Sequence, residues 1–299
     1  METPTNGFFR MDEESFARLS QYVTQTYGIQ LPATKKSILE NHLDEKVKNL
    51  AMSSYKEFVD FILNSGSSED ELLHVLDLIT THKTEFFREA SHFQFLTQQF
   101  LPRHQQENNC DNLKIWSAGC STGEEPYSLL MTLEEYKKIH PKLTYTLLAS
   151  DISTRVMHTA CHGEYDVEKM QTVPSGMRHT YFMCDKADPK QVKIKPHYRT
   201  KIQYKRVNLM HDNYGLAKHD LDIIFCRNVL IYFEKPTQEQ VIRKFCNLLR
   251  PGGLLFLGHS ESVMGMNLPL SQVGNAVYQV QEPEARSQEP ESPALEFTS

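Results

Sequence analysis

The stretch of residues 113–130 constrains the fold of this chain more than any other part of it. It begins with an apolar run, residues 113–118, whose pattern is typical of a buried strand. Small residues follow at 119–123, and the two glycines among them permit a sharp turn and a close approach to a ligand. The next helix begins with Glu-Glu-Pro at 124–126, where proline is tolerated because this is a first helical turn. The stretch therefore predicts a strand, a glycine turn and a helix, which together open the nucleotide-type site of a doubly wound sheet.

The acidic residues at the start of this helix indicate which ligand the turn suits. A phosphate cradle uses bare backbone N–H groups and often a lysine. Here Glu124 and Glu125 stand where a phosphate would sit, and no Gly-Lys-Ser or Gly-Lys-Thr follows. Repulsion between like charges argues against a phosphorylated ligand. S-adenosylmethionine (SAM) fits better, because it carries a sulfonium and an amino group and has no phosphate. The alternative is a tight turn that binds no ligand.

Composition, charge and cysteine pattern narrow the class of protein. The chain has 299 residues, enough for one large or two ordinary domains, and its net charge of −6 does not favour general nucleic-acid binding. No apolar run approaches membrane-spanning length, and the first residues lack the segments of a signal peptide. The six cysteines are scattered without a Cys-x-x-Cys pair, which suggests reduced thiols. We therefore expect a cytoplasmic protein without direct membrane insertion.

The sequence does not predict a metal site. His158, Cys161 and His162 lie close together on a predicted helix, and the two histidines share a face. A structural zinc site needs a fourth ligand, which is not evident, and the His-Glu-x-x-His motif is absent.

The first part of the chain predicts a small all-helical domain, assigned to residues 1–90. Apolar residues recur at three- and four-residue spacing from Asp12 onward, and Gly28 ends the first run. Further amphipathic helices follow, the last with a capping box at 68–71. Residues 80–88, TTHKTEFFR, break the helical period, and they would either line a cleft at the domain joint or form a plain connector.

Strands and helices alternate through most of the second part, assigned to residues 91–280. A helix at 91–100 and a polar loop at 105–112 come before the central strand, and a turn is expected at 249–253. The further strands are expected at 144–150, 202–207, 221–226 and 254–257, with a last edge strand at 276–280. This alternation predicts an α/β fold with a mostly parallel sheet covered on both faces.

Polar residues follow several of these strands and should meet at one rim, because ligands bind at the carboxyl ends of parallel strands. Asp151 stands about 30 residues past the glycine turn, where an acid can accept hydrogen bonds from a ribose diol. The alternative is that Asp151 or Ser153 only caps the next helix. Asn208 and Asn228 follow two further strands and should reach the same rim.

Two segments depart from the alternation. Residues 163–200 are rich in lysine, proline, histidine and tyrosine, and this locally basic insert is either solvated or a docking surface for an acidic partner. Residues 281–299 are polar, acidic and proline-bearing, so we predict a disordered tail.

Several segments together resemble the CheR family of chemotaxis-receptor glutamate methyltransferases. They are TTHKTEFFRE, WSAGCSTGEEPYSLLM, LLASDIS, VNL, IIFCRNVLIYF and LRPGGLLFLGHSE, and the resemblance covers about residues 10–280. It implies a helical domain followed by a Rossmann-like, SAM-dependent methyltransferase domain with a small β-subdomain inserted at about 163–200. Such a protein methylates glutamate side chains on the cytoplasmic helices of chemoreceptors and releases S-adenosylhomocysteine (SAH).

The resemblance also implies site residues. Those that would bind SAM are His82, Thr84, Arg88, Gly119, Glu124, Glu125, Asp151, Asn208, Leu209, Arg227 and Asn228. Asp151 would hold the ribose, and one of the two glutamates, left undecided here, would face the methionine end. Tyr232 and Arg103 resemble residues proposed near the point of methyl transfer. His82 departs from the family, where asparagine is frequent at this position.

The implied partner is the cytoplasmic domain of a chemoreceptor, which the β-subdomain would help to dock, and a monomer is expected. The identity of the receptor and of its glutamates stays open, as does the binding of a receptor pentapeptide. Two alternatives remain on the residues alone: a methyltransferase that acts on another protein or a small molecule, and a non-catalytic SAM-binding regulatory or scaffold module.

Overall fold

The computed structural model describes residues 10–64, 69–80, 83–108, 112–185 and 188–281. Ser68 of the predicted capping box, His82 and the predicted acidic tail from residue 282 onward lie outside these described residues.

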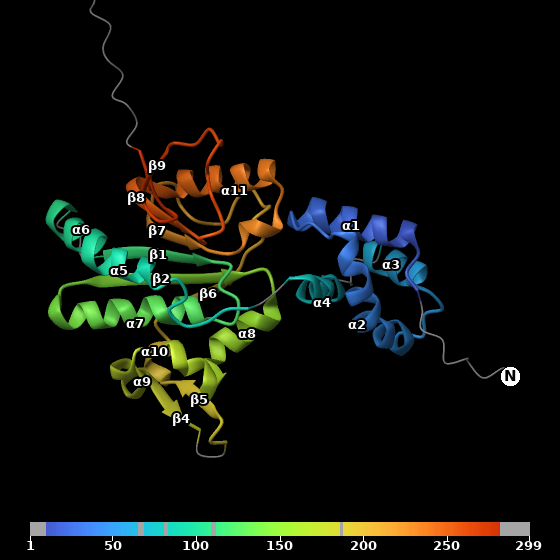
Figure 1. Cartoon of the computed structure of the whole chain (residues 1–299), viewed down its shortest axis with the longest axis horizontal. Helices are drawn as coiled ribbons and strands as arrows, with labels where there is room; N and C mark the ends of the chain where they lie inside the picture. Colours follow the sequence, from blue (N-terminus) through green and yellow to red (C-terminus); the bar gives the residue numbers. More distant parts are fainter. Residues whose placement is uncertain (1–9, 65–68, 81–82, 109–111, 186–187, 282–299) are drawn as a thin grey trace, which may run out of the picture.

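Within the described residues, four α-helices form the N-terminal domain, drawn in blue to teal in Figure 1. They are α1 (Glu13–Tyr27), α2 (Lys36–Asn49), α3 (Tyr55–Asn64) and α4 (Glu69–Ile79). Their apolar faces meet in a core in which Leu19, Leu39 and Phe58 are fully buried. Asp12 caps α1 by accepting from the Ser15 N–H, and Gly28 ends the helix in the left-handed region at φ 74°. The predicted helical domain is confirmed.

A seven-stranded sheet organises the rest of the chain, in the order β6-β2-β1-β7-β8-β10-β9. The strands are β1 (Asn112–Ala118), β2 (Thr144–Asp151), β6 (Ile202–Arg206), β7 (Leu221–Cys226), β8 (Leu249–Leu257), β9 (Leu270–Gly274) and β10 (Val277–Val280). The first five in spatial order run parallel, and β10 alone runs the other way, antiparallel to both β8 and β9. The strand order reverses between β1 and β7, which is where ligands bind in such sheets. The predicted α/β fold is confirmed.

Helices cover both faces of the sheet, α7 (Glu124–Ile139) on one side and α11 (Lys235–Leu248) on the other (Figure 1). Because side chains alternate along a strand, neighbours belong to different cores. Ile115 packs in the same core as Leu129 and Leu130 of α7. Trp116 points to the other side, where its ring centroid lies 5.4 Å from that of Phe245 on α11.

Three expectations for the boundaries were wrong. The polar loop expected at 105–112 is helical as far as Asn108, because α6 (Leu101–Asn108) continues the helical run of α5 (Ser91–Phe95) and η2 (Leu96–Phe100). The turn expected at 249–253 is a bulge inside β8, where Leu221 pairs with Leu249 but Ile223 pairs with Leu254. The strand β10 is not the edge of the sheet, because β9 pairs with its outer side.

The insert forms its own small antiparallel sheet, in the order β3-β5-β4. Its elements are α8 (Thr154–His162) leading in, then β3 (Glu164–Asp166), η3 (Val167–Thr172), α9 (Ser175–Tyr181), β4 (Phe182–Cys184), β5 (Gln191–Ile194) and α10 (Pro196–Arg199). It lies on the side of α7 away from the main sheet (Figure 1). Phe86 packs edge-on against Tyr165 and Phe182, at centroid distances of 5.0 and 5.4 Å, so the segment before α5 is anchored to the insert.

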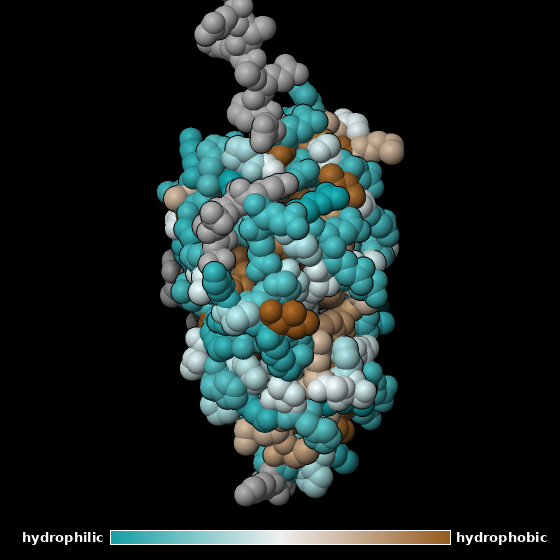
Figure 2. Space-filling view, turned by 90° about the vertical axis from the view of Figure 1, so that its left-hand side faces the viewer, coloured by the Kyte–Doolittle hydropathy of each residue, from teal (hydrophilic) through white to brown (hydrophobic). Residues whose placement is uncertain are grey.

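The face turned away from the helical domain is mainly hydrophilic, with hydrophobic residues in small separate areas (Figure 2). Among the residues that the structure describes, no helix combines the length and the apolar character needed to cross a membrane.

The burial of α7 generates a test of this packing. Leu130 is 1% exposed, whereas Ile139 on the same helix is 78% exposed. We expect Leu130→Ala to lower the free energy of unfolding by about 2–5 kcal/mol through lost packing and a cavity. Ile139→Ala should change it by less than about 0.5 kcal/mol. Urea unfolding followed by circular dichroism checks both variants, and equal losses would contradict the assigned packing of α7.

Candidate functional site

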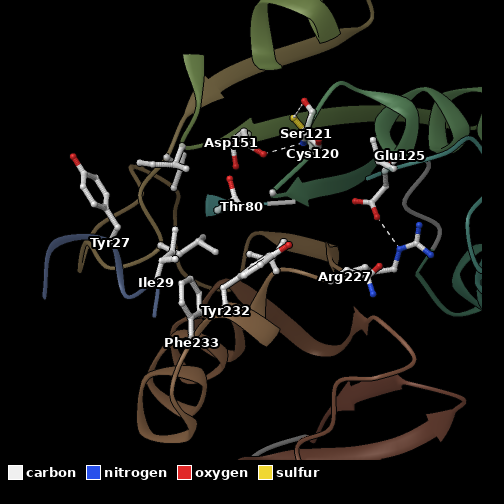
Figure 3. Close-up of a pocket in the computed structure, with 18 of the residues that line it drawn as sticks. Tyr27, Ile29, Thr80, Cys120, Ser121, Glu125, Asp151, Arg227, Tyr232 and Phe233 are labelled. Carbon is white, nitrogen blue, oxygen red and sulfur yellow. Dashed lines mark hydrogen bonds and ion pairs between the residues drawn. The ribbon is translucent and has the colours of Figure 1, made fainter. Parts of the chain in front are cut away.

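A pocket lies at the carboxyl ends of β1, β2 and β7, with about 980 Å³ of empty space when the solvent at its open side is included. The helical domain closes one side with Tyr27 and Ile29, and Glu125 and Arg227 lie on the opposite side (Figure 3). The predicted SAM-binding residues that line it are Thr84, Arg88, Gly119, Glu125, Asp151, Asn208, Leu209, Arg227 and Asn228.

Four N–H groups of the glycine turn already donate to acceptors within the protein. Those of Gly119 and Cys120 both donate to the Ser150 carbonyl at 2.8 Å, and that of Gly123 donates to the Cys120 carbonyl at 3.0 Å. The Ser121 N–H donates to Asp151 Oδ2 at 2.9 Å. A phosphate cradle needs such amides to point at the ligand. The turn is therefore built to bring β1 and β2 together rather than to hold a phosphate.

The two glutamates have different surroundings. Glu125 lines the pocket, and its carboxylate accepts from Ser117 Oγ and from Arg227 Nε, both at 2.7 Å. Glu124 does not line the pocket and is fully buried; it pairs with Lys169 of the insert and accepts from Thr122 Oγ1 at 2.6 Å. Of the two, Glu125 is thus the one placed to face a ligand. Both charges are compensated, so the exclusion of phosphate rests on the occupied amides more than on like-charge repulsion.

Arg227 connects three segments at the end of β7. Its side chain is 2% exposed, and besides Glu125 it bonds the Arg88 carbonyl at 2.6 Å. Its Nη1 also lies 3.3 Å from His92 Nδ1. Burial lowers the pKa of the His92 imidazole to about 4, so this ring is neutral near neutral pH. His92 can then accept from Arg227 while its Nε2 donates to the Asn275 carbonyl at 2.9 Å.

One group of residues has the spacing of a metal site. Among the described residues, ligand atoms of Glu89, His92 and His259 lie within 4.8 Å of one another. However, the Arg227 guanidinium lies against two of them, 3.4 Å from Glu89 Oε2 and 3.3 Å from His92 Nδ1. The guanidinium would repel a metal ion at this position, so we do not propose a metal centre here.

Asp151 organises the rim and Ser153 caps the next helix. Asp151 Oδ1 accepts from the Ser153 N–H at 3.0 Å, and Oδ2 accepts from Ser121. The Ser153 hydroxyl oxygen accepts from the Val156 N–H at the start of α8, so the capping role falls to Ser153. A carboxylate can accept about four hydrogen bonds, so these two are compatible with further bonds to a ribose diol.

Two polar side-chain atoms of the pocket suit a ligand such as SAM. Among the described residues, Asn228 Oδ1 and Ser121 Oγ are buried and have no hydrogen-bond partner. Both residues also adopt positive φ, 59° for Asn228 and 49° for Ser121, which is unusual for residues other than glycine. Unpaired buried acceptors and backbone strain concentrate at ligand sites. SAM has an ammonium group, two ribose hydroxyls and an adenine amino group to donate, so the residues fit it.

Asn208 joins the two domains at the pocket. Its Nδ2 donates to the Thr26 carbonyl of α1 at 2.8 Å, and its Oδ1 accepts from the Met210 N–H at 3.0 Å. Sequence reasoning missed the helical-domain residues Tyr27 and Ile29 that line the pocket beside this contact. The available signal was their position on either side of Gly28, the residue that ends α1.

The two residues predicted near methyl transfer lie far apart in the fold. Tyr232 lines the pocket (Figure 3). Arg103 is exposed on α6 and lines a separate cavity with Arg250 and Gly252, at the start of β8 and thus at the amino ends of the parallel strands. The structure therefore does not bring Arg103 to the site, and the arginines that line the pocket are Arg88 and Arg227.

Comparison with known proteins gives consistent matches. Residues 14–80 match the family described as CheR methyltransferase, all-alpha domain, and residues 82–278 match CheR methyltransferase, SAM binding domain. The chemotaxis protein methyltransferase of Borreliella burgdorferi is 32% identical over 286 residues, covering 93% of this chain and 99% of that protein. That of Salmonella typhimurium is 33% identical over 269 residues, covering 90% of each. Chemotaxis protein methyltransferase 2 of Pseudomonas aeruginosa is 33% identical, covering 91% of this chain and 95% of that protein.

The geometry around Asp151 generates a binding prediction. We expect Asp151→Ala to weaken SAH binding by about 1–3 kcal/mol, the scale of lost buried hydrogen bonds. Isothermal titration calorimetry measures this, with Asp220→Ala as the control that leaves binding unchanged, because Asp220 is an exposed acid just before β7, at its amino end.

Because Asp151 also holds two backbone amides, a ligand analogue separates the two roles. An SAH analogue without ribose hydroxyls should bind the parent and Asp151→Ala with nearly equal affinity. If Asp151→Ala lowers the affinity for both ligands by the same factor, Asp151 supports the turn and does not hold the ribose.

Proposed function

The chain belongs to the CheR methyltransferase family, and from this we propose that it methylates glutamate side chains on the cytoplasmic helices of chemoreceptors. SAM is the methyl donor, and the products are glutamate methyl esters and SAH. The observation that carries the proposal is the pocket at the strand rim. Four amides of its turn are occupied, and its unpaired acceptors suit a donor without phosphate. Relatives named chemotaxis protein methyltransferases support a protein substrate in chemotaxis.

The residues of the pocket divide the work of holding the donor. Asp151 would accept from the ribose, and Asn228 Oδ1 and Ser121 Oγ would take further donors. Glu125 and Arg88 would lie toward the methionyl end, with Thr84 and the predicted His82 nearby in the chain. When bound, SAM supplies a methyl group activated by its sulfonium.

The glutamate carboxylate that accepts the methyl group mainly needs to be oriented by the protein. A glutamate carboxylate is ionised at neutral pH, so its methylation needs no general base. The protein must instead place one carboxylate oxygen in line with the methyl group, and orientation of this kind can supply several kcal/mol. Apolar residues such as Ile29, Val229 and Phe233 line the pocket, and they would limit the water that competes for the carboxylate. Tyr232 or Arg88 would donate a hydrogen bond to the oxygen that does not react.

The insert is proposed as the docking surface for the receptor. The protein would act as a monomer in the cytoplasm. Part of its positive charge is already paired, because Lys193 bonds Glu164 at 3.0 Å and Asp185 at 2.9 Å. Docking through charge would therefore fall to its other basic residues, such as Lys190, which is exposed.

Label transfer tests the proposal against its rivals. Incubation with SAM carrying a tritiated methyl group and a receptor cytoplasmic fragment should label the fragment, and mild base should release the label as methanol because the product is a carboxyl ester. Base-stable label would indicate methylation of another atom. Unlabelled receptor together with intact SAM binding would support a non-catalytic module.

The position of Tyr232 generates a kinetic prediction. Tyr232→Phe should lower turnover about tenfold, the effect of one lost hydrogen bond in the transition state, and should change SAH affinity less than about twofold. The control is Tyr136→Phe, because the Tyr136 hydroxyl bonds Gln105 far from the pocket. Single-turnover assays and calorimetry measure the two quantities. Full activity of Tyr232→Phe would remove this residue from the mechanism.

A further inference from the structure

A buried carboxylate lies behind the segment of residues 228–233, which follows β7 and lines the pocket. Glu261 is 8% exposed, and its two oxygens accept four backbone N–H groups. Oε1 accepts from Leu230 at 2.8 Å and Ile231 at 3.3 Å. Oε2 accepts from Asn228 at 2.9 Å and Gly258 at 2.6 Å. Three of these four donors thus belong to the segment that carries Asn228 and Tyr232.

The carbonyl groups of the same segment are held from the other sides. Gln238 of α11 donates through Nε2 to the Leu230 and Phe233 carbonyls, each at 2.9 Å. The Tyr232 carbonyl accepts from the Gln30 N–H of the helical domain at 2.9 Å. Two side chains and the neighbouring domain therefore fix the backbone on which the Tyr232 ring stands.

The arrangement is costly for the fold alone. Burial raises the pKa of the Glu261 carboxyl, although the four backbone donors act in the opposite direction. If one partner of such a network is removed, the remaining buried polar groups lose their hydrogen bonds, which costs free energy. A buried carboxylate is therefore a costly way to hold a loop. Asn228 is also held at φ 59°, and a Cβ on Gly258 would lie 2.5 Å from its Nδ2. Two local constraints thus converge on the segment next to the pocket.

We propose that Glu261 is a positioning residue, which fixes Asn228 toward SAM and Tyr232 toward the methyl acceptor through their backbone. Glu261 does not line the pocket and touches neither substrate, so it acts only through this segment. The part that concerns Tyr232 rests on the function proposed above. The part that concerns Asn228 needs only the binding of SAM or SAH.

Double-mutant cycles test the inference. Glu261→Gln keeps the shape but turns an NH₂ group toward two of the four donors. We expect it to weaken SAH binding at least about fivefold and to lower turnover at least about tenfold. In an Asn228→Gly background, which keeps positive φ accessible, Glu261→Gln should add less than about twofold to the loss of SAH affinity. In a Tyr232→Phe background it should likewise add little to the loss of turnover.

Controls separate positioning from loss of fold. Glu239→Gln, on the solvent side of α11 where Glu239 pairs with Arg243, should leave both quantities unchanged. If Glu261→Gln does not fold, Gln238→Ala serves instead, because it removes the bonds to two carbonyls of the same segment and should give the same non-additive pattern.

The outcomes distinguish the two proposals. Folded Glu261→Gln with SAH affinity and turnover within twofold of the parent would overturn the inference. The inference would also be overturned if Glu261→Gln caused the same fold loss in the Asn228→Gly and Tyr232→Phe backgrounds as in the parent. Independent effects of this kind would indicate general destabilisation. A parent protein that binds no SAH would overturn the proposed function and the inference with it.

Discussion

The buried ion pair between Arg227 and Glu125, 2.7 Å long, is the contact on which the site depends. It joins the end of β7 to the start of α7 across the point where the strand order reverses. Through the Arg88 carbonyl and His92, the same guanidinium also fixes the segment between the two domains. Breaking a buried pair by removing one partner typically costs about 3–5 kcal/mol. Loss of Arg227 would therefore leave an uncompensated carboxylate in the pocket wall and release the Arg88 segment.

The glycine turn is braced from a second side by the insert. Lys169 pairs with the fully buried Glu124, and the Tyr165 hydroxyl donates to the Thr122 carbonyl at 2.8 Å. Phe86 packs on two aromatic rings of the same subdomain. The subdomain proposed for docking is thus joined directly to the turn that borders the pocket. These contacts would therefore connect a partner bound to the insert with a ligand bound at the rim.

Local patterns explain what the sequence could predict. The strand, turn and helix from β1 to α7 and the rim position of Asp151 follow from periodicity and turn chemistry within short windows. The bulge in β8 and the pairing of β9 depend on distant partners, and they were missed. The choice between Glu124 and Glu125 was undecidable because Lys169 and Arg227 come from remote segments. Glu261 was missed because an acid that accepts backbone amides has no periodic signature; its place in LRPGGLLFLGHSE was the only signal.

The central claim is that the pocket between β1, β2, β7 and the helical domain holds the adenosyl methyl donor. A crystal structure of the chain with SAH tests it most directly. We expect the ribose within hydrogen-bond distance of the Asp151 carboxylate, a ligand donor on Asn228 Oδ1, and the homocysteine end toward Glu125 and Arg88. SAH bound elsewhere, for example in the cavity beside Arg103, or an empty pocket at saturating SAH, would contradict the account.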